Sequence, residues 1–370
     1  MRRLWLVLAV FVLLAAGFGI RRMTAKKPAS RPEPVRAAEA AAPTPAQPAA
    51  TTPDEPPVAP AKPLVAKSPA GCSGSDSAVS VSLKSFLASQ NADGSWGEGI
   101  EYVDGHRYTK TGATALALLA FLGAGYSPLS KDVIGEKPVG EAIAKAAAWL
   151  EANNDGDALN LSIAGLALNE LYGLTGDDKY KVAAEAGLAK VAAAQGSDGS
   201  WSSDLLSSLM AAETLASARL SGMTVPDGAV DRAVAYLRAE VARKEGAAAA
   251  GLALLSRNDP SLEAAKNLMV SLPPDWTQQN WEYWYLGSLA MFQIDGPSGD
   301  GWKSWNQPMR DTLLRNQARD GTWPGTGGAT AAAVRGGYGT LSLEIYYRYA
   351  NATGTKSGPA GVDTPADPKK

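Results

Sequence analysis

At residues 195–201 the chain reads QGSDGSW, and the same pattern returns as QNADGSW at 90–96 and QARDGTW at 317–323. Each copy of this Q-x-x-D-G-[ST]-W pattern ends a stretch in which apolar residues have helical spacing. Asp-Gly predicts a chain reversal, because glycine adopts the positive φ that a tight turn needs. The tryptophan can pack back over the turn, and the glutamine amide can satisfy backbone groups at the helix end. We therefore predict three structural clasps, not catalytic sites. Their residues are Gln90, Gly94, Trp96, Gln195, Gly199, Trp201, Gln317, Gly321 and Trp323.

The region from residue 71 to 351 has the composition of a helical domain. Its apolar residues recur at intervals of three and four, Ala and Leu dominate, and runs of β-branched residues are missing. This pattern predicts helices throughout and needs no strand. With Gly, Pro and Asp/Asn/Ser as boundaries, we predict twelve helices, which make six hairpins. They lie near 78–90, 111–124, 139–152, 159–175, 180–195, 204–221, 228–241, 245–256, 261–271, 279–293, 302–317 and 336–350.

The repeats carry a resemblance to a known family. Together with the aromatic segments WEYWYLG (281–287) and GGYGT (336–340), they resemble the QW repeats of the terpenoid cyclase and protein prenyltransferase superfamily, which includes squalene-hopene cyclases. The chain is similar to bacterial squalene-cyclase-like members of undefined activity over roughly residues 77–350. The resemblance implies an all-α (α/α)6 toroid of six helical hairpins, with the clasped helices outside. The inner helices would start near residues 111, 159, 204, 245, 279 and 336. An ordinary helical bundle or solenoid is the alternative fold.

The two ends of the chain differ from this domain in composition. Residues 4–20 are uncharged and lie between basic residues, which predicts a single-pass membrane anchor over residues 1–27. A cleavable signal peptide is the alternative. Residues 28–70 hold 12 of the 24 prolines, so we expect a disordered linker there, and a disordered tail over 352–370. The basic residues after the span favour a cytoplasmic domain, and the long linker favours the extracytoplasmic side, which we prefer.

Composition and missing motifs exclude several chemistries. With 35 basic and 37 acidic residues, the net charge of −2 gives no attraction to nucleic acid. One cysteine, Cys72, and one histidine, His106, cannot supply the ligand sets of zinc sites, so we predict no metal or cofactor. The Asp-x-Asp-Asp motif with which class II triterpene cyclases protonate an alkene is absent, and so are the Asp-rich helices of class I enzymes. The nearest run, DGD at 155–157, is predicted to be a turn and helix cap. Standard cyclase activity is therefore not expected.

The candidate pocket residues lie at the starts of predicted inner helices. Trp281, Trp284 and Tyr285 share one helix face by their spacing, whereas Glu282 and Tyr283 point elsewhere. Interlayer packing is the alternative role for this aromatic cluster. His106 lies in the loop before the first inner helix and either rims a pocket or is simply solvated. The pocket candidates are His106, Asp204, Trp281, Glu282, Tyr283, Trp284, Tyr285 and Tyr338. The plausible acids are Glu170, Asp204, Glu213, Glu282 and Glu344, each of which could equally be a cap, an ion-pair partner or a rim charge.

Three functional hypotheses follow. The first is a membrane-tethered toroid that binds an apolar ligand, an isoprenoid or another lipid. The second is a non-catalytic envelope scaffold that binds a protein or a glycan. The third is a polysaccharide-cleaving enzyme, which needs paired carboxylates across the ring. A side-chain-filled centre would favour the scaffold, and an open apolar cavity with a buried, inward-pointing carboxylate would favour an enzyme.

Overall fold

The computed structural model describes residues 73–349. The predicted anchor at 1–27, linker at 28–70 and tail at 352–370 lie outside these residues, as does Cys72. Within 73–349, none of the helices has the length and apolar character needed to cross a membrane. The twelve helices of this part are α1 (Ser73–Ser89), α2 (Lys110–Gly123), α3 (Val139–Ala152), α4 (Ala158–Thr175), α5 (Asp178–Ala193), α6 (Leu205–Leu220), α7 (Ala229–Ala242), α8 (Ala248–Leu255), α9 (Leu262–Val270), α10 (Trp281–Asp295), α11 (Asp300–Asn316) and α12 (Ala329–Tyr349). A short 3-10 helix, η1 (Trp276–Gln278), precedes α10.

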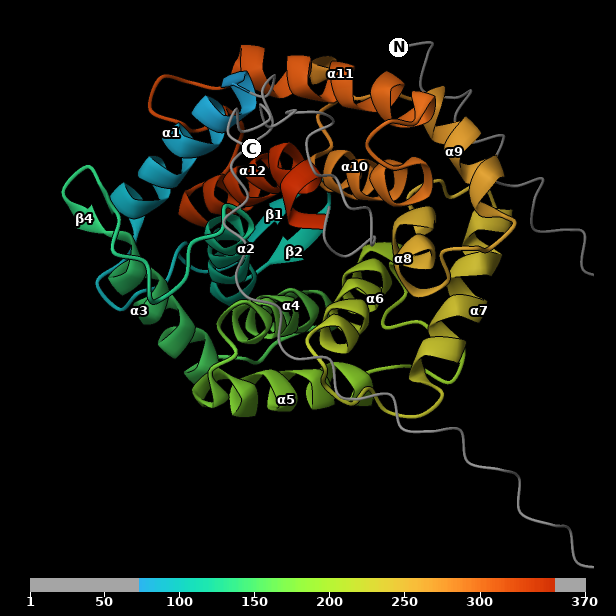
Figure 1. Ribbon diagram of the computed structural model, residues 1–370, viewed down its shortest axis with the longest axis horizontal. Coiled ribbons are helices and arrows are strands. Elements are labelled where there is room, and N and C mark those ends of the chain that lie inside the picture. The colour runs from blue at the N-terminus through green and yellow to red at the C-terminus, as the bar shows by residue number, and fades with distance from the viewer. Residues whose placement is uncertain (1–72, 350–370) are drawn as a thin grey trace, which may run out of the picture. The chain divides into compact units, whose positions relative to one another are not determined.

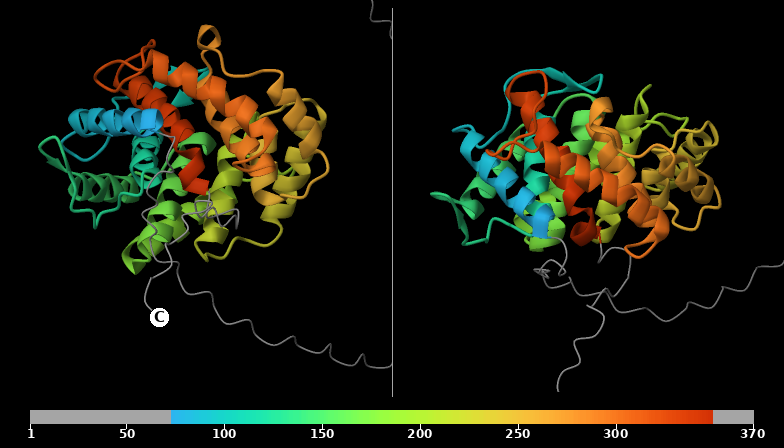
Figure 2. Two further views of the ribbon diagram at one scale, coloured as in Figure 1. Left: turned by 45° about the horizontal axis from the view of Figure 1, so that its top comes forward. Right: turned by 90° about the horizontal axis from the view of Figure 1, so that it is seen from above.

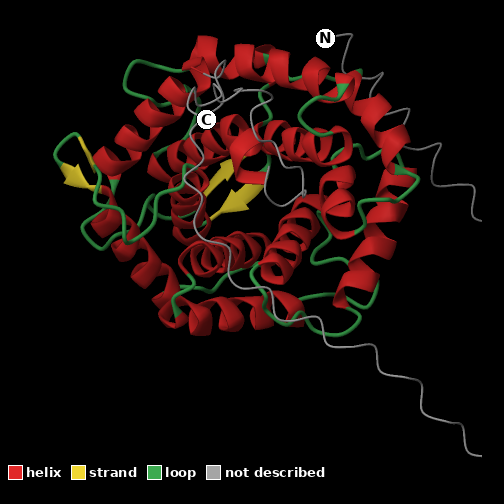
Figure 3. Ribbon diagram, viewed as in Figure 1, coloured by secondary structure: helices red, strands yellow, loops and turns green. Residues whose placement is uncertain are grey.

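The twelve helices form two concentric layers (Figures 1 and 3). The even-numbered helices make the inner layer: each contacts the next, and α12 contacts α2, which closes the ring. The odd-numbered helices pack around them. The described residues are therefore an all-α toroid, and the predicted alternation of outer and inner helices is confirmed. A closed inner ring excludes the open solenoid.

The burial of the two layers explains their composition. In α2 every residue from Thr111 to Gly123 is buried, because an inner helix contacts neighbours on all sides. The outer helix α3 buries only one stripe, which includes Val139, Ile143, Ala146 and Leu150. The inner helices are therefore composed mainly of small and apolar residues, whereas the outer helices carry charged residues on their exposed sides.

The three clasps share one set of hydrogen bonds. Each tryptophan indole donates to the carbonyl ten residues earlier, and each aspartate Oδ1 accepts from the hydroxyl residue two positions later. The indole bonds are Trp96 to Phe86 (2.7 Å), Trp201 to Val191 (2.6 Å) and Trp323 to Leu313 (2.9 Å). The aspartates are Asp93, Asp198 and Asp320. The indole hydrogen bond therefore holds each turn against the helix that precedes it.

The glutamines extend the clasps to a second helix. Each side-chain amide donates to the glycine carbonyl of its own turn and to a backbone carbonyl near the start of the next outer helix around the ring. The second bonds are Gln90 to Ala142 on α3, Gln195 to Ala229 on α7 and Gln317 to Ala78 on α1. The clasps therefore connect outer helices in pairs around the ring.

The prediction that no strand is needed was wrong. Two short antiparallel hairpins are present among residues 73–349: β1 (Glu101–Val103) with β2 (His106–Tyr108), and β3 (Val133–Ile134) with β4 (Lys137–Pro138). The first hairpin turns at Asp104 and Gly105, whose φ values are 50° and 88°. Asp-Gly with both φ positive is a preferred two-residue hairpin turn, and three-residue strands are too short to give a visible alternation.

Helix α12 starts at Ala329, earlier than the predicted start at residue 336. The glycine pair that was interpreted as a helix start lies inside the helix. A Cβ at Gly337 would be 2.6 Å from that of Leu116, and one at Gly336 would be 2.9 Å from the Phe86 ring. These glycines allow close packing of α12 on α2 and α1.

Candidate functional site

The β1–β2 hairpin lies on one face of the ring, over the first turns of the inner helices (Figures 1 and 2). Glu101 accepts hydrogen bonds from the backbone of Gly328 and, at 2.7 Å, of Ala331 at the start of α12. Arg107 forms an ion pair of 2.7 Å with Asp157, the N-cap of α4. The hairpin therefore bridges inner helices that are distant in sequence.

Strand pairing sorts the side chains of the hairpin into two faces. Val103 pairs with His106 and Glu101 with Tyr108, and these residues face the ring. Tyr102 pairs with Arg107 on the opposite face, where Tyr102 is 65% exposed. The hairpin thus brings His106 and Tyr108 to the ring.

Glu282, in the first turn of α10, is the centre of the site. It is only 4% exposed. Its Oε2 lies 2.6 Å from His106 Nδ1, and its Oε1 accepts a hydrogen bond of 2.6 Å from the hydroxyl of Tyr108. The contact between His106 and Glu282 is an ion pair by distance, but Nδ1 is not aligned for a hydrogen bond. The hydroxyls of Tyr108 and Tyr338 are 3.0 Å apart, so α12 also contributes.

The protonation of this pair is shifted toward neutral pH. Burial raises the pKa of Glu282 to about 7, although the contacts with His106 and Tyr108 act against burial. The pKa of His106 is raised by its contact with Glu282, against the opposing effect of its own burial, and Asp204 and Asp104 add to the rise. Both shifts act to keep protons on the pair to higher pH than on the free side chains.

Asp204 lies on the other side of the imidazole. It is the N-cap of α6, where its Oδ1 accepts from the backbone of Ser207 at 2.9 Å. The same oxygen is 4.0 Å from His106 Nε2. Burial acts to raise the pKa of Asp204, but hydrogen bonds from Ser202 and Ser207 outweigh it and lower the pKa. One imidazole ring therefore separates a carboxyl group whose pKa is raised from one whose pKa is lowered.

The side chains of Asp204 and His106 are also the accessible part of the site. They are 35% and 31% exposed, whereas Glu282 lies beneath them. Three predicted pocket candidates, His106, Asp204 and Glu282, thus meet, and Tyr338 joins them through Tyr108.

The tryptophans of the aromatic cluster do not face this site. Trp281 and Trp284 are buried with ring centroids 5.0 Å apart, and Trp281 lies 6.2 Å from Trp323 of the third clasp. Trp276 of η1 packs on both. Tyr283 packs on Trp305 of α11 at 5.3 Å. These residues join α10 to the outer layer, which corresponds to the packing alternative.

Tyr285 and the remaining inner carboxylates form a second polar cluster, nearer the carboxyl ends of the inner helices. The Tyr285 hydroxyl donates to Glu213 and accepts from Arg348 at 2.8 Å. Arg348 also pairs with Glu170. Glu344 is fully buried, and no hydrogen bond reaches either of its carboxyl oxygens. The Tyr285 ring packs 5.6 Å from that of Tyr338, so these two tyrosines connect the two clusters.

Two residues of the site were missed from the sequence, Asp104 and Tyr108. The Asp-Gly dipeptide at 104–105 was the signal that could have found them. A two-residue turn there makes residues 101, 103, 106 and 108 share a face. Over residues 73–349, no group of three or more His, Cys, Asp or Glu side chains is placed to hold a metal ion.

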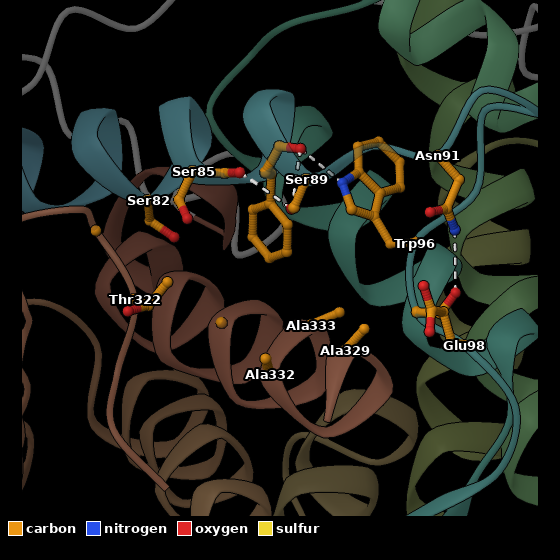
Figure 4. A pocket seen from close by; sticks show the side chains of 14 residues that line it. Ser82, Ser85, Ser89, Asn91, Trp96, Glu98, Thr322, Ala329, Ala332 and Ala333 are labelled. Carbon is orange, nitrogen blue, oxygen red and sulfur yellow. Dashed lines mark hydrogen bonds between the residues drawn. The ribbon is translucent and has the colours of Figure 1, made fainter. Parts of the chain in front are cut away.

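A separate pocket of about 190 Å3 lies between α1 and α12 (Figure 4). Serines of α1 form one wall, Phe86 and Trp96 another, and small residues of α12 the floor. The α12 residues are Ala329, Ala332, Ala333 and Gly336. This pocket is distinct from the hairpin site.

Comparison with known proteins gives similarity of fold alone. No protein-family model matches the chain, and no curated protein sequence matches it. The GH76A α-1,6-mannanase of Salegentibacter sp. HEL1_6 is similar in structure, with a TM-score of 0.54 and 13% identity over 74% of this chain and 98% of that one. An inactive variant of it in complex with α-1,6-mannotriose gives 0.55 and 12% over 74% and 99%. A type II terpene cyclase variant from Scytonema, in complex with geranylgeranyl dihydroxybenzoate, gives 0.48 and 12% over 75% and 97%. The similarity to the mannanase structures thus shows the fold alone, an α/α toroid.

Proposed function

We propose that this protein is an acid–base glycosidase, with His106, held by Glu282, as the proton donor and Asp204 as the nucleophile. The observation that carries the proposal is the position of His106 between two carboxyl groups, with Nδ1 2.6 Å from the buried Glu282 and Nε2 4.0 Å from Asp204. The pKa values of these two carboxyl groups shift in opposite directions, raised to about 7 at Glu282 and lowered at Asp204. Neighbouring groups whose pKa values are pushed apart are the arrangement expected of an acid and its partner base or nucleophile. At neutral pH the His106–Glu282 pair would hold a proton, and Asp204 would be ionised.

The spacing favours a retaining reaction. The 4.0 Å between His106 Nε2 and Asp204 Oδ1 is nearer to the roughly 5–5.5 Å of retaining glycosidases than to the roughly 6.5–9.5 Å of inverting ones. Asp204 would attack the anomeric carbon while Nε2 of His106 protonates the departing oxygen. Water, deprotonated by His106, would then break the glycosyl ester and restore both residues. The sum is one glycosidic bond broken and one water consumed.

The glycan substrate is supported by the surroundings of the site. Ser202 donates a hydrogen bond to Asp204 at the site, and the outward face of the same hairpin carries the exposed Tyr102 ring and the Arg107–Asp157 ion pair. Aromatic rings with polar neighbours suit sugars, which present both apolar faces and hydroxyls. The fold similarity to the α-1,6-mannanase makes α-1,6-mannan the first substrate to offer. With the predicted anchor and linker, we propose that the domain acts close to a membrane, on the extracytoplasmic side.

Release of reducing ends from α-1,6-mannan and a panel of other glycans tests the proposal. Substitution of His106→Asn, Glu282→Gln or Asp204→Asn should each lower the rate at least about 100-fold. Asp198→Asn, in an exposed clasp turn, is the matched control and should keep the wild-type rate. Binding of a glycan without cleavage would indicate the scaffold function. The absence of both binding and cleavage would refute the proposal.

A second candidate is binding of an apolar ligand, an isoprenoid or another lipid. It is favoured by the pocket between α1 and α12, whose walls include Phe86 and Trp96 (Figure 4). Native mass spectrometry of the full chain purified from its own membranes tests it. A retained lipid, lost in Ala333→Trp but not in Asp204→Asn, would support this function, and absence of lipid after incubation with polyprenols would remove it.

A further inference from the structure

Asp104 lies at the tip of the β1–β2 hairpin and contacts the helix that carries Glu282. Its Oδ2 accepts hydrogen bonds from the backbone N–H groups of Trp281 at 2.5 Å and Glu282 at 3.4 Å. These N–H groups have no partner within the helix because they belong to its first turn. A carboxylate there also interacts favourably with the helix dipole. The hairpin tip is therefore joined to the turn of α10 that presents Glu282.

The backbone at the tip supports a specific role for this residue. Asp104 has φ 50°, in the left-handed region, and Lys244 is the other non-glycine residue of 73–349 with a positive φ. Aspartate tolerates this region better than most residues, but the conformation still costs free energy. Burial raises the pKa of Asp104, and its two backbone hydrogen bonds act in the opposite direction. These costs are offset only while the carboxylate is docked on α10.

The rest of the hairpin is held independently of the tip. Glu101 is bound to the start of α12, and Arg107 is paired with Asp157 of α4. Loss of the Asp104 contact should therefore release the tip and His106 without detaching the hairpin.

We infer that Asp104 is a positioning residue: its carboxylate fastens the hairpin tip to α10 and so holds His106 against Glu282. The importance of this contact for catalysis rests on the function proposed above, but the contact itself does not. The charged groups that face His106 are Glu282 from α10, Asp204 from the start of α6 and Asp104 from its own turn. The positive charge of Arg335 on α12 acts to lower the pKa of Asp104.

The single histidine of the chain allows a direct test. Full-length protein labelled with 15N-histidine gives ring nitrogen signals from one imidazole, so their titration reports His106 alone. In the wild type the pKa should lie above 6.5. In Asp104→Ala it should fall toward 6.5, and amide hydrogen exchange of residues 102–107 should rise at least tenfold. Asp104→Asn, which keeps an acceptor oxygen, should give an intermediate titration.

Asp177→Ala is the matched control, since Asp177 caps the outer helix α5 through the backbone N–H of Lys179 but lies away from the hairpin. It should change neither readout. An unchanged His106 titration and unchanged exchange in Asp104→Ala would overturn the inference. If that variant does not fold by circular dichroism, a wild-type titration in Asp104→Asn would overturn it instead. If the wild type cleaves no glycan, but Asp104→Ala still shows the lowered His106 pKa and the faster exchange, the result would count against the proposed function alone.

Discussion

Gln317 donates a hydrogen bond of 2.9 Å from its side-chain amide to the backbone carbonyl of Ala78, 239 positions earlier in the chain. The first residue ends α11 and the second lies in α1, so this contact joins the last outer helix to the first (Figure 1). The other two clasp glutamines make the same bond over much shorter separations, 52 positions for Gln90 and 34 for Gln195. The third clasp is therefore the one that closes the outer layer.

Gln317→Ala should detach α1 more than it weakens the rest of the domain. The substitution leaves the carbonyls of Ala78 and Gly321 without their donor, which costs about 1–2 kcal/mol. Hydrogen exchange should become faster in α1 and stay unchanged in α6. Gln195→Ala removes the matching bonds of the second clasp and is the control, because it should leave α1 protected. Equal protection of α1 in both variants would contradict ring closure by the third clasp.

The clasp glycines combine a positive φ with close packing against a neighbouring helix, and a pair of variants separates these two contributions to stability. Gly199 has φ 91°, and a Cβ there would collide with the carbonyl oxygen of Arg232 on α7. Gly222 has φ 73° and nothing within 4 Å of the same position. Alanine costs about 1–2 kcal/mol at either site because of φ. At Gly199 the collision should add about 1–3 kcal/mol. Urea unfolding of Gly199→Ala and Gly222→Ala measures the difference, and equal losses would show that close packing plays no part.

The clasps also explain how much of the fold was predictable. Gln, Asp-Gly and Trp at fixed spacing specify a local structure, and helical periodicity is strong in a chain rich in Ala and Leu. The alternation of layers follows from these local signals. The start of α12 does not follow from local signals. Gly336 and Gly337 lie inside this helix and pack closely on Phe86 and Leu116, which are some 220 to 250 positions away in sequence.

The candidate site was predictable only as separate residues. His106, Glu282 and Asp204 were each identifiable as polar residues near helix starts, but they come from a hairpin and two helices that meet only when the ring closes. Tyr285 and Trp281 fall on one helix face by spacing, yet one contacts Tyr338 in the ring and the other Trp323 of the third clasp. Spacing defines a face, whereas the neighbours of that face depend on the crossing of helices in the fold.

Glu344→Gln should stabilise the protein at neutral pH. Burial raises the pKa of Glu344 well above its usual range, so the folded state binds this proton more tightly than the unfolded chain does. Folding must therefore take up a proton, and its cost grows with pH above about 4.5. Glutamine removes that cost, and we expect a gain of about 1–3 kcal/mol at pH 7.5. The gain should shrink toward pH 5. Glu240→Gln on the outer helix α7 is the control, and a pH-independent effect of Glu344→Gln would contradict the prediction.

The His106–Glu282 pair should make the domain less stable as pH rises from 5 to 8. Glu282 has its pKa raised to about 7, so between about 4.5 and 7 the folded state binds more protons than the unfolded chain. The raised pKa of His106 acts in the same direction, because its stabilisation is present below about 6.5 and is lost as pH rises through the folded-state value. Each proton contributes at most about 1.4 kcal/mol per pH unit. Unfolding free energies of the wild type and of the double variant Glu282→Gln/His106→Asn, measured in urea at pH 5, 6.5 and 8, test this. The decline should be clearly smaller in the double variant. A wild type whose stability stays level or rises over this range would show that the pair holds no proton at neutral pH, and His106 could then not serve as the acid.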